Sequence, residues 1–151
     1  MKINRLVPVV LLLLACSRAI AADGLTATKS DHSAKVTMDR LETLLTQKGM
    51  TIFARVDHAA GAAKIGKQLR PTELLIFGNP QGGTPFIECS QTVGIDLPLK
   101  ALVWQDESGQ VWIGYNDPGY IAQRHGAPKC PAVETLRNAV SGIVAAAAGA
   151  R

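Results

Sequence analysis

The residues with the clearest chemical potential lie in the stretch RPTELLIFGNPQGGTPFIE, where a polar glycine loop follows an apolar run. Threonine before proline is a favoured helix start, so we predict a helix from Thr84 to about Val93. Unpaired amides in its first turn favour a bound anion. A tight turn that needs glycine and a cap explains the same pattern, and both interpretations stay open. The candidate ligand residues in this loop are Asn79, Gly82, Gly83 and Thr84.

A second group of reactive side chains surrounds the sequence YNDP. A carboxylate, an amine and an imidazole that meet at one end of a sheet can polarise a small polar ligand or transfer protons. The simpler interpretation is that Asp117 caps a helix beginning at Pro118. The candidate ligand residues in this group are Lys100, Tyr115, Asn116, Asp117 and His125.

The histidines and cysteines give no metal-binding motif. His32, His58 and His125 occur without an HExxH, CxxC or His-x-His spacing, so we expect no metal and no cofactor. Cys89 and Cys130 form an even pair, which in an oxidising compartment favours one disulfide. Two separate buried thiols, with Cys130 reactive beside Pro131, are the alternative.

The first 21 residues have the layout of a secretory signal, with a basic start, an apolar run and small residues before Ala22. We therefore expect an exported, periplasmic protein whose mature chain begins at Ala22. The sequence LLACS also resembles a lipobox, so lipid attachment at Cys16 in the bacterial envelope is the alternative, and a membrane is expected as a partner only in that case.

Without residues 1–21 the net charge is small. Of 16 Lys and Arg residues three lie in that segment and none of the 12 acidic residues do, which leaves 13 − 12 = +1. No Lys/Arg cluster with interleaved aromatics is present, so we expect no nucleic acid partner. Hydrophobic residues make up 47% of the chain and aromatic ones 5%, which predicts an aliphatic core in a single domain over residues 22–151.

The hydrophobic periodicity predicts an α+β fold: a single antiparallel-rich sheet packed by helices. In residues 50–57 we expect Ile52 and Ala54 to share a face. A hairpin joins strands 97–105 and 110–116, so Trp104 and Trp112 are placed to stack across it. The other predicted elements are a short first strand, a helix over 34–48, a helical turn after residue 57, a strand over 72–78, a helix from Pro118 to about His125, and a last helix from about Pro131, whose alanine-rich tail over 144–151 is expected to fray.

The motifs LRPTELLIFGNP, GTP, DLPLKALVW, YNDP and RHG occur in this order between about Lys29 and Gly126. In this order they strongly resemble the bacterial family called domain of unknown function 302. The resemblance implies a curved, TBP-like sheet of strand, helix, strands and helix, and the likeness to TBP carries no implication of DNA binding. The family has no established biochemical activity, so the resemblance implies an architecture and no reaction.

Three functional hypotheses follow. The first is a non-catalytic exported module that binds a small molecule, an anionic ligand or a protein through a cleft formed by residues 79–84, 115–118 and 125. The second is an enzyme that uses Asp117, His125 and Lys100. The third is a structural envelope protein that forms a homodimer.

Overall fold

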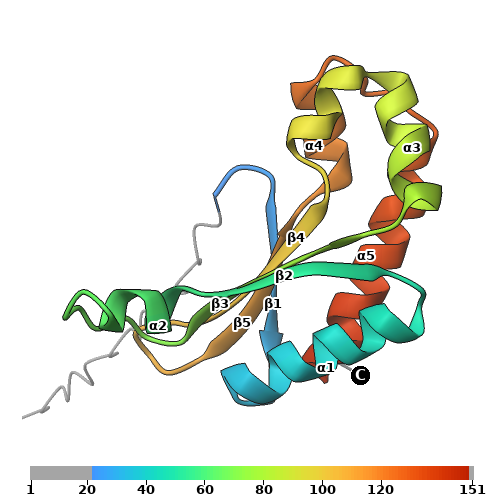
Figure 1. The fold of residues 1–151 in the computed structure, drawn as a ribbon. Coiled ribbons are helices and arrows are strands. Elements are labelled where there is room, and N and C mark those ends of the chain that lie inside the picture. The colour runs from blue at the N-terminus through green and yellow to red at the C-terminus, as the bar shows by residue number, and fades with distance from the viewer. Residues whose placement is uncertain (1–21, 150–151) are drawn as a thin grey trace, which may run out of the picture.

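The computed structural model describes residues 22–149. The predicted signal, the candidate lipid attachment site Cys16 and the last two residues lie outside the described part of the chain. Five antiparallel strands form one sheet in the order β1-β5-β4-β3-β2 (Figure 1). The strands are β1 (Leu25–Ser30), β2 (Thr51–Asp57), β3 (Thr72–Gly78), β4 (Leu99–Gln105) and β5 (Val111–Asn116).

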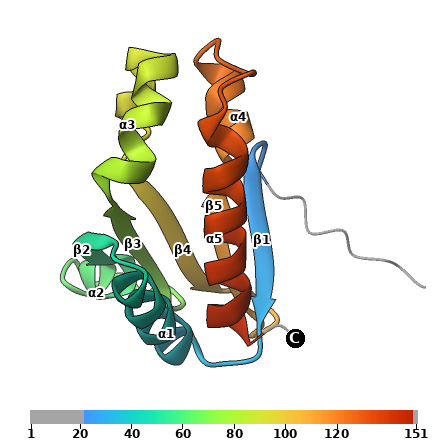
Figure 2. The same cartoon turned by 90° about the vertical axis from the view of Figure 1, so that its right-hand side faces the viewer.

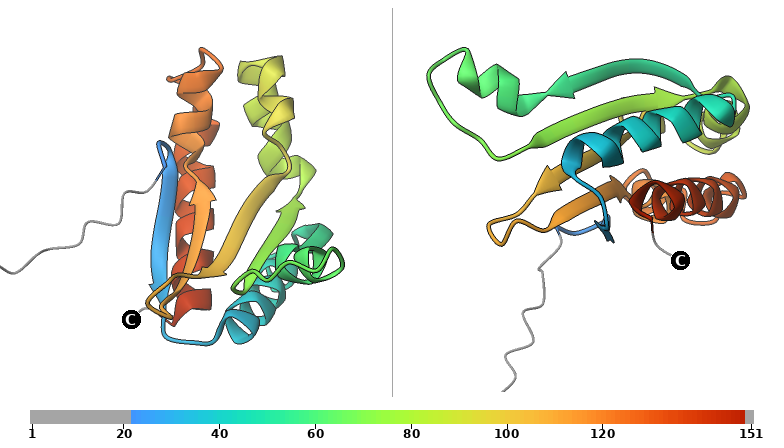
Figure 3. Two further views of the ribbon diagram at one scale, coloured as in Figure 1. Left: turned by 90° about the vertical axis from the view of Figure 1, so that its left-hand side faces the viewer. Right: turned by 90° about the horizontal axis from the view of Figure 1, so that it is seen from below.

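Two long helices cover one face of this sheet. Figure 2 looks onto α1 and α5 in front of the strands, and the left panel of Figure 3 looks onto the opposite face, where the strands lie in front. The predicted α+β class is therefore confirmed. The helices are α1 (Ala34–Gln47), α2 (His58–Ala63), α3 (Pro80–Cys89), α4 (Pro118–Arg124) and α5 (Ala132–Ala148), with a 3-10 helix η1 (Gln91–Ile95) after α3.

The alternating pattern of the inner strands explains this layering. Every second side chain of β3, β4 and β5 points at α1 and α5 and is removed from water, which supplies the main favourable free energy of folding. The strand side chains buried on this face are Leu75, Phe77, Ala101, Val103, Val111, Ile113 and Tyr115. A second apolar cluster joins α3, η1, α4 and the start of α5.

The edge strand β2 departs from the predicted alternation. Ile52 pairs with Phe77 and Ala54 pairs with Ile76, so a β-bulge places one extra residue, Phe53, between them. Ile52 and Ala54 therefore face opposite sides of the sheet, and the prediction that they share a face was wrong. A bulge inserts one residue and re-aims its side chain. Phe53 is left 59% exposed at this edge.

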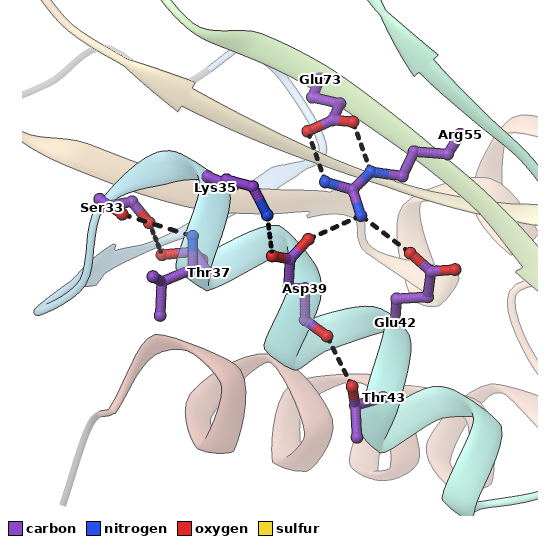
Figure 4. A network of polar contacts seen from close by, with 9 residues as sticks. Ser33, Lys35, Thr37, Asp39, Glu42, Thr43, Arg55 and Glu73 are labelled. Carbon is purple, nitrogen blue, oxygen red and sulfur yellow. Dashed lines mark hydrogen bonds and ion pairs between the residues drawn. The ribbon is translucent and has the colours of Figure 1, made fainter.

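After the bulge, the side chain of Arg55 turns towards α1. Its guanidinium binds Glu73 through two nitrogens, and Nη1 also reaches Asp39 at 2.8 Å and Glu42 at 2.9 Å (Figure 4). Lys35 joins the network through the other carboxylate oxygen of Asp39. The bulge thus sets the register in which the edge strand is held to α1 by charge-assisted hydrogen bonds.

Over residues 144–149 the alanine-rich end of α5 is helical and capped, whereas fraying was predicted for residues 144–151. Ala147 and Ala148 are fully buried, and the helix continues to a left-handed Gly149. Alanine lets the helix end lie close to its neighbours, and Arg40 donates to the carbonyls of Ala146 and Ala147. Satisfied carbonyls stabilise a helix terminus that would otherwise have free acceptors.

The cysteine pair and the tryptophan pair were both predicted correctly. Cys89 and Cys130 form a disulfide that joins the end of α3 to the segment preceding α5, with a Cα–Cα distance of 5.8 Å. Trp104 and Trp112 are direct cross-strand partners, and their rings stack with centroids 6.3 Å apart. The stack lies on the sheet face opposite α1 and α5.

Candidate functional site

The first turn of α3 is built differently from the predicted loop. The helix begins at Pro80, with Asn79 as its N-cap, so the prediction of a helix start at Thr84 and Pro85 was wrong. Asn-Pro is as good a start signal as Thr-Pro, and it comes first along the chain. Thr84 lies inside the helix, where the following proline costs one backbone hydrogen bond.

The amides expected to bind an anion are already occupied. Gly82 N donates to Asn79 Oδ1 at 2.8 Å, and Gly83 N donates to the Asn79 carbonyl at 3.0 Å. An N-cap side chain satisfies the donors that the first turn would otherwise leave free. The anion interpretation of this loop therefore loses its basis.

The same residues instead form the wall of an apolar cavity of about 410 Å³. It lies where the start of α3 passes the ends of β3 and β4 and the middle of α5. None of its lining side chains carries a charge, so the site favours a ligand dominated by carbon. The lining residues are Met50, Phe53, Phe77, Gly78, Asn79, Pro80, Gly82, Gly83, Thr84, Ile87, Gly94, Leu97, Pro98, Leu99, Leu136, Ala139 and Val140.

Two helical glycines determine the shape of this cavity. A Cβ atom on Gly82 would lie 3.1 Å from Leu136 Cδ2, so the missing side chain lets α3 approach α5. A Cβ on Gly83 would lie 3.7 Å from Leu97 Cδ1, an ordinary contact distance. Gly82 thus permits the close approach of the two helices, and the missing side chain of Gly83 keeps the space in front of Leu97 open. Phe53, placed by the β-bulge, stands at the exposed rim.

His125 and Asp96 form a polar cluster that joins the C-terminal ends of α4 and η1. His125 Nε2 lies 2.7 Å from Asp96 Oδ2, and Nδ1 lies 2.9 Å from the Thr92 hydroxyl. Because a carboxylate oxygen accepts, Nε2–H donates to Asp96, and Nδ1 of a neutral ring accepts from Thr92. A row of hydroxyl, imidazole and carboxylate can activate a hydroxyl as a nucleophile. Neither Thr92 nor His125 lines the apolar cavity, and the row ties η1 to the end of α4.

The residues of the YNDP sequence lie in different surroundings: Asp117 caps a helix, Tyr115 is buried and Asn116 is exposed. Asp117 caps α4, as predicted, by accepting from Tyr120 N, and its carboxylate also binds Arg137 of α5. The Arg137 guanidinium holds the pKa of Asp117 below its ordinary value. Tyr115 is 5% exposed, and this burial, with the Asp117 charge beside it, raises the pKa of its hydroxyl. Asn116 is exposed at the end of β5.

No hydrogen bond or ion pair joins the predicted catalytic residues Asp117, His125 and Lys100 to one another. Asp117 binds Arg137 and His125 binds Asp96, while Lys100 Nζ donates to the carbonyls of Asp96 and Pro98. A hollow of only about 10 Å³, the size of one water, is lined by Lys100, Tyr115 and Asn116 among others. The small hollow shares Leu99 and Val140 with the large cavity as wall residues, but of the three predicted segments only 79–84 lines the large cavity. Ligand binding by the candidate residues outside the 79–84 segment stays a prediction.

The sequence alone did not point to most of the cavity walls. Met50, Leu97 and Leu136 come from three distant segments, and each one, considered singly, is an ordinary apolar residue. Leu136 lies on the buried face of the last helix, but nothing in the sequence pairs it with Gly82. The partners Asp96 and Arg137 were missed for the same reason, because their contacts are made only in the folded chain.

Within residues 22–149 no group of three His, Cys, Asp or Glu side chains is arranged to hold a metal ion. None of the helices in this part of the chain has the length and apolarity needed to cross a membrane.

A family model described as "Domain of unknown function DUF302" matches residues 26–146. The chain belongs to the DUF302 family. The resemblance stated from the sequence motifs is therefore confirmed over most of the chain.

A solved structure gives the same architecture. The crystal structure of a DUF302 protein from Bacillus stearothermophilus superposes with a TM-score of 0.69 and 22% identity, and the match covers 85% of this chain and 98% of that one. At this identity the likeness concerns the fold. This DUF302 chain therefore has the sheet-and-helix arrangement of that structure.

Closer sequence relatives are parts of larger proteins. The protein named fluoride-specific ion channel FluC 1 from Brucella suis is 49% identical over 107 residues, which are 71% of this chain and 42% of that protein. A protein of the same name from Brucella abortus matches equally well over 40% of its length. This DUF302 chain thus spans about two fifths of the length of the curated relatives it matches. The name of those relatives refers to their full length.

Proposed function

We propose that this DUF302 domain is a non-catalytic binding module that takes up a small apolar ligand in the cavity between α3, α5 and the ends of β3 and β4. The observation that carries the proposal is the cavity of about 410 Å³, whose walls are almost entirely apolar. Sites for small molecules are concave, mostly apolar and roughly 300–1,000 Å³ in volume. Asn79 and Thr84 provide the few polar groups that orient a ligand in such a site.

The expected affinity follows from the chemistry of the walls. Each buried methylene contributes about 0.8 kcal/mol, so about eight of them contribute roughly 6 kcal/mol before ordering costs are subtracted. A free energy of about 6 kcal/mol corresponds to a dissociation constant of about 40 μM, so ligands of this size bind in about the tens-of-micromolar to millimolar range once ordering costs are included. Polar contacts from Asn79 are limited because its Oδ1 already accepts the hydrogen bond from Gly82 N.

Binding is favoured over catalysis because the reactive side chains are used elsewhere. Asp117, His125 and Lys100 are held by Arg137, Asp96 and two carbonyls, and none of the three lines the cavity. A general acid or base must reach the atom whose proton it transfers. A ligand in this cavity meets no such group.

A neutral fluorescent probe tests the proposal. N-phenyl-1-naphthylamine brightens in apolar surroundings, and we expect it to bind the full protein saturably, one molecule per chain. G83L adds a side chain towards Leu97 across the cavity, at a position where a Cβ meets only ordinary contacts, so we expect it to weaken binding at least about tenfold.

The matched control is G61L, the same substitution in α2, where a Cβ meets nothing within 4 Å. Gly61 does not line the cavity, and G61L should bind the probe as the parent protein does. Thermal unfolding of both variants establishes that they are folded. Absence of saturable binding by the parent protein, or unchanged binding by folded G83L, would refute the proposal.

We also propose that the domain works outside the cytosol. Support comes from the bond between Cys89 and Cys130, because structural disulfides persist mainly in oxidising compartments. Intact mass of protein from its native envelope tests this. A mass starting at Ala22 supports simple export, a lipid-modified mass starting at Cys16 supports an anchored protein, and an uncleaved chain with free thiols would contradict both.

A further inference from the structure

A second hollow adjoins the apolar cavity. It is a groove of about 560 Å³ between the C-terminal end of α1 and the middle of α5, and it shares Met50 and Ala139 with the cavity as wall residues. Figure 2 shows α5 running past α3 at one end of the molecule and past α1 at the other, so the two hollows follow one another along α5. The groove is lined by Leu44, Lys48, Met50, Asn138, Ala139, Gly142, Ile143 and Ala146.

The polarity of the walls changes along this path. The cavity has no charged lining residue, whereas the groove has one, Lys48, with the exposed amide of Asn138 also in its wall. Lys48 is exposed, and within residues 22–149 its ammonium makes no hydrogen bond or ion pair, in contrast to Lys35, Arg40 and Arg55. An unpaired cation therefore lies in the wall of the groove that adjoins the apolar cavity.

The groove is open because the α5 residues facing it are small. Ala139, Gly142 and Ala146 leave the space that larger residues would fill, and a Cβ on Gly142 would meet nothing within 4 Å. Leu44 and Ile143 give the floor apolar side chains. A flexible hydrocarbon chain that continues from the cavity past Met50 therefore meets apolar side chains on the floor of the groove, and its polar residues Lys48 and Asn138 are exposed.

Building on the proposed function, we infer that the ligand is a single-chain amphiphile with an anionic head group, such as a long-chain carboxylate. Its tail lies in the apolar cavity, its middle passes Met50 and Ala139, and its carboxylate lies beside Lys48. The tail supplies most of the affinity, because buried methylenes contribute additively. An exposed ion pair with Lys48 adds a preference of about two- to fivefold for the anion over a neutral head group.

Displacement of N-phenyl-1-naphthylamine by matched ligands tests this assignment. We expect hexadecanoate to displace the probe at lower concentration than octanoate, and tetradecanoate to bind about two- to fivefold better than tetradecanol. In K48Q this preference for the carboxylate should disappear while the alcohol binds as before. K64Q, which removes an exposed lysine that lines neither hollow, should keep the preference.

The substitution G142L tests the path itself. A leucine on this side of α5 fills the groove and leaves the cavity open. We therefore expect G142L to weaken the binding of hexadecanoate at least about tenfold and to leave the binding of octanoate and of the probe unchanged. Thermal unfolding shows whether the variant is folded.

The outcomes separate the two proposals. Suppose that the probe binds the parent protein and that G83L blocks this binding. If the parent protein then binds tetradecanoate and tetradecanol with equal affinity, or if G142L binds hexadecanoate as tightly as the parent protein does, the amphiphile assignment is overturned and the apolar binding site stands. If the probe does not bind the parent protein at all, both proposals fail.

Discussion

The guanidinium of Arg137 donates two hydrogen bonds to the carboxylate of Asp117, from Nε to Oδ2 at 2.8 Å and from Nη2 to Oδ1 at 3.0 Å. Asp117 caps α4 and Arg137 lies on α5, so the pair joins the two helices. The guanidinium holds the pKa of Asp117 below its ordinary value of 3.8, although burial acts in the opposite direction. The unfolded chain therefore takes up this proton at a higher pH than the folded protein does.

This pair makes stability depend on pH in the acid range. Its stabilisation is fully present above the unfolded pKa near 4 and is lost as the pH falls through the lowered folded pKa. We expect D117N, which keeps a capping oxygen, to reduce the free energy of unfolding by about 1 kcal/mol at pH 6 and by much less at pH 2. Urea unfolding of both proteins from pH 2 to 6 measures the difference.

The matched control is D57N, which also exchanges an aspartate cap for asparagine. Asp57 accepts from Ala60 N at the start of α2 and has no ion-pair partner among the residues of the described chain. Its effect on the free energy of unfolding should vary less with pH. A pH-independent effect of D117N would argue against the ion pair as the source.

The ion-pair network around Arg55 predicts that even the exchange of this arginine for lysine lowers the stability of the protein. The planar guanidinium binds Glu73 through two nitrogens and also reaches Asp39 and Glu42, a geometry that a single ammonium cannot reproduce. We expect R55K to lower the free energy of unfolding by about 1–2 kcal/mol. Chemical denaturation at low and moderate salt measures the loss.

Arg70 provides the matched control for this substitution. Its contact with Glu107 is 3.7 Å long, and both side chains are mostly exposed, so R70K should change stability by less than about 0.5 kcal/mol. Equal effects of R55K and R70K would show that the network adds nothing beyond single surface pairs.

Local signals in the sequence predicted those elements that depend on neighbouring residues. Asp117 followed by Pro118 correctly placed the start of α4, and the hairpin pattern correctly placed Trp104 opposite Trp112. These predictions succeed because cap, proline and turn act within a few residues of one another. The resemblance to the DUF302 family supplied the architecture as a whole.

Predictions failed where two local signals indicated different helix starts, or where contacts with a distant segment determined the local structure. Both Asn79-Pro80 and Thr84-Pro85 satisfy the rule for a helix start, and nothing nearby shows that α3 forms from the first. The alternation in residues 50–57 is regular, yet pairing with β3 introduces a bulge at Phe53. The cavity could not be predicted because contacts such as that of Gly82 with Leu136 depend on how α3 and α5 meet.

Two glycines should respond in opposite directions to the same substitution. A Cβ on Gly114 would lie 3.0 Å from the Trp104 ring and 3.1 Å from the Thr26 carbonyl, so we expect G114A to lower the free energy of unfolding by about 1–3 kcal/mol. Gly142 lies inside α5 with open space around it, and G142A should raise stability by about 1 kcal/mol. Thermal and urea unfolding of both variants compares them directly. A stabilising G114A would mean that the Trp104 ring moves away without cost.

The disulfide between Cys89 and Cys130 should account for a large part of the stability. The two cysteines are 41 residues apart, and closing a loop of this length in the unfolded chain corresponds to about 4 kcal/mol in the chain-entropy model. We expect C89S/C130S to lose roughly 2–4 kcal/mol of the free energy of unfolding, measured by urea denaturation. Reductant should shift the midpoint of the parent protein towards that of the variant and leave the variant unchanged. Alkylation of both cysteines in the native protein before reduction would show that the bond does not form.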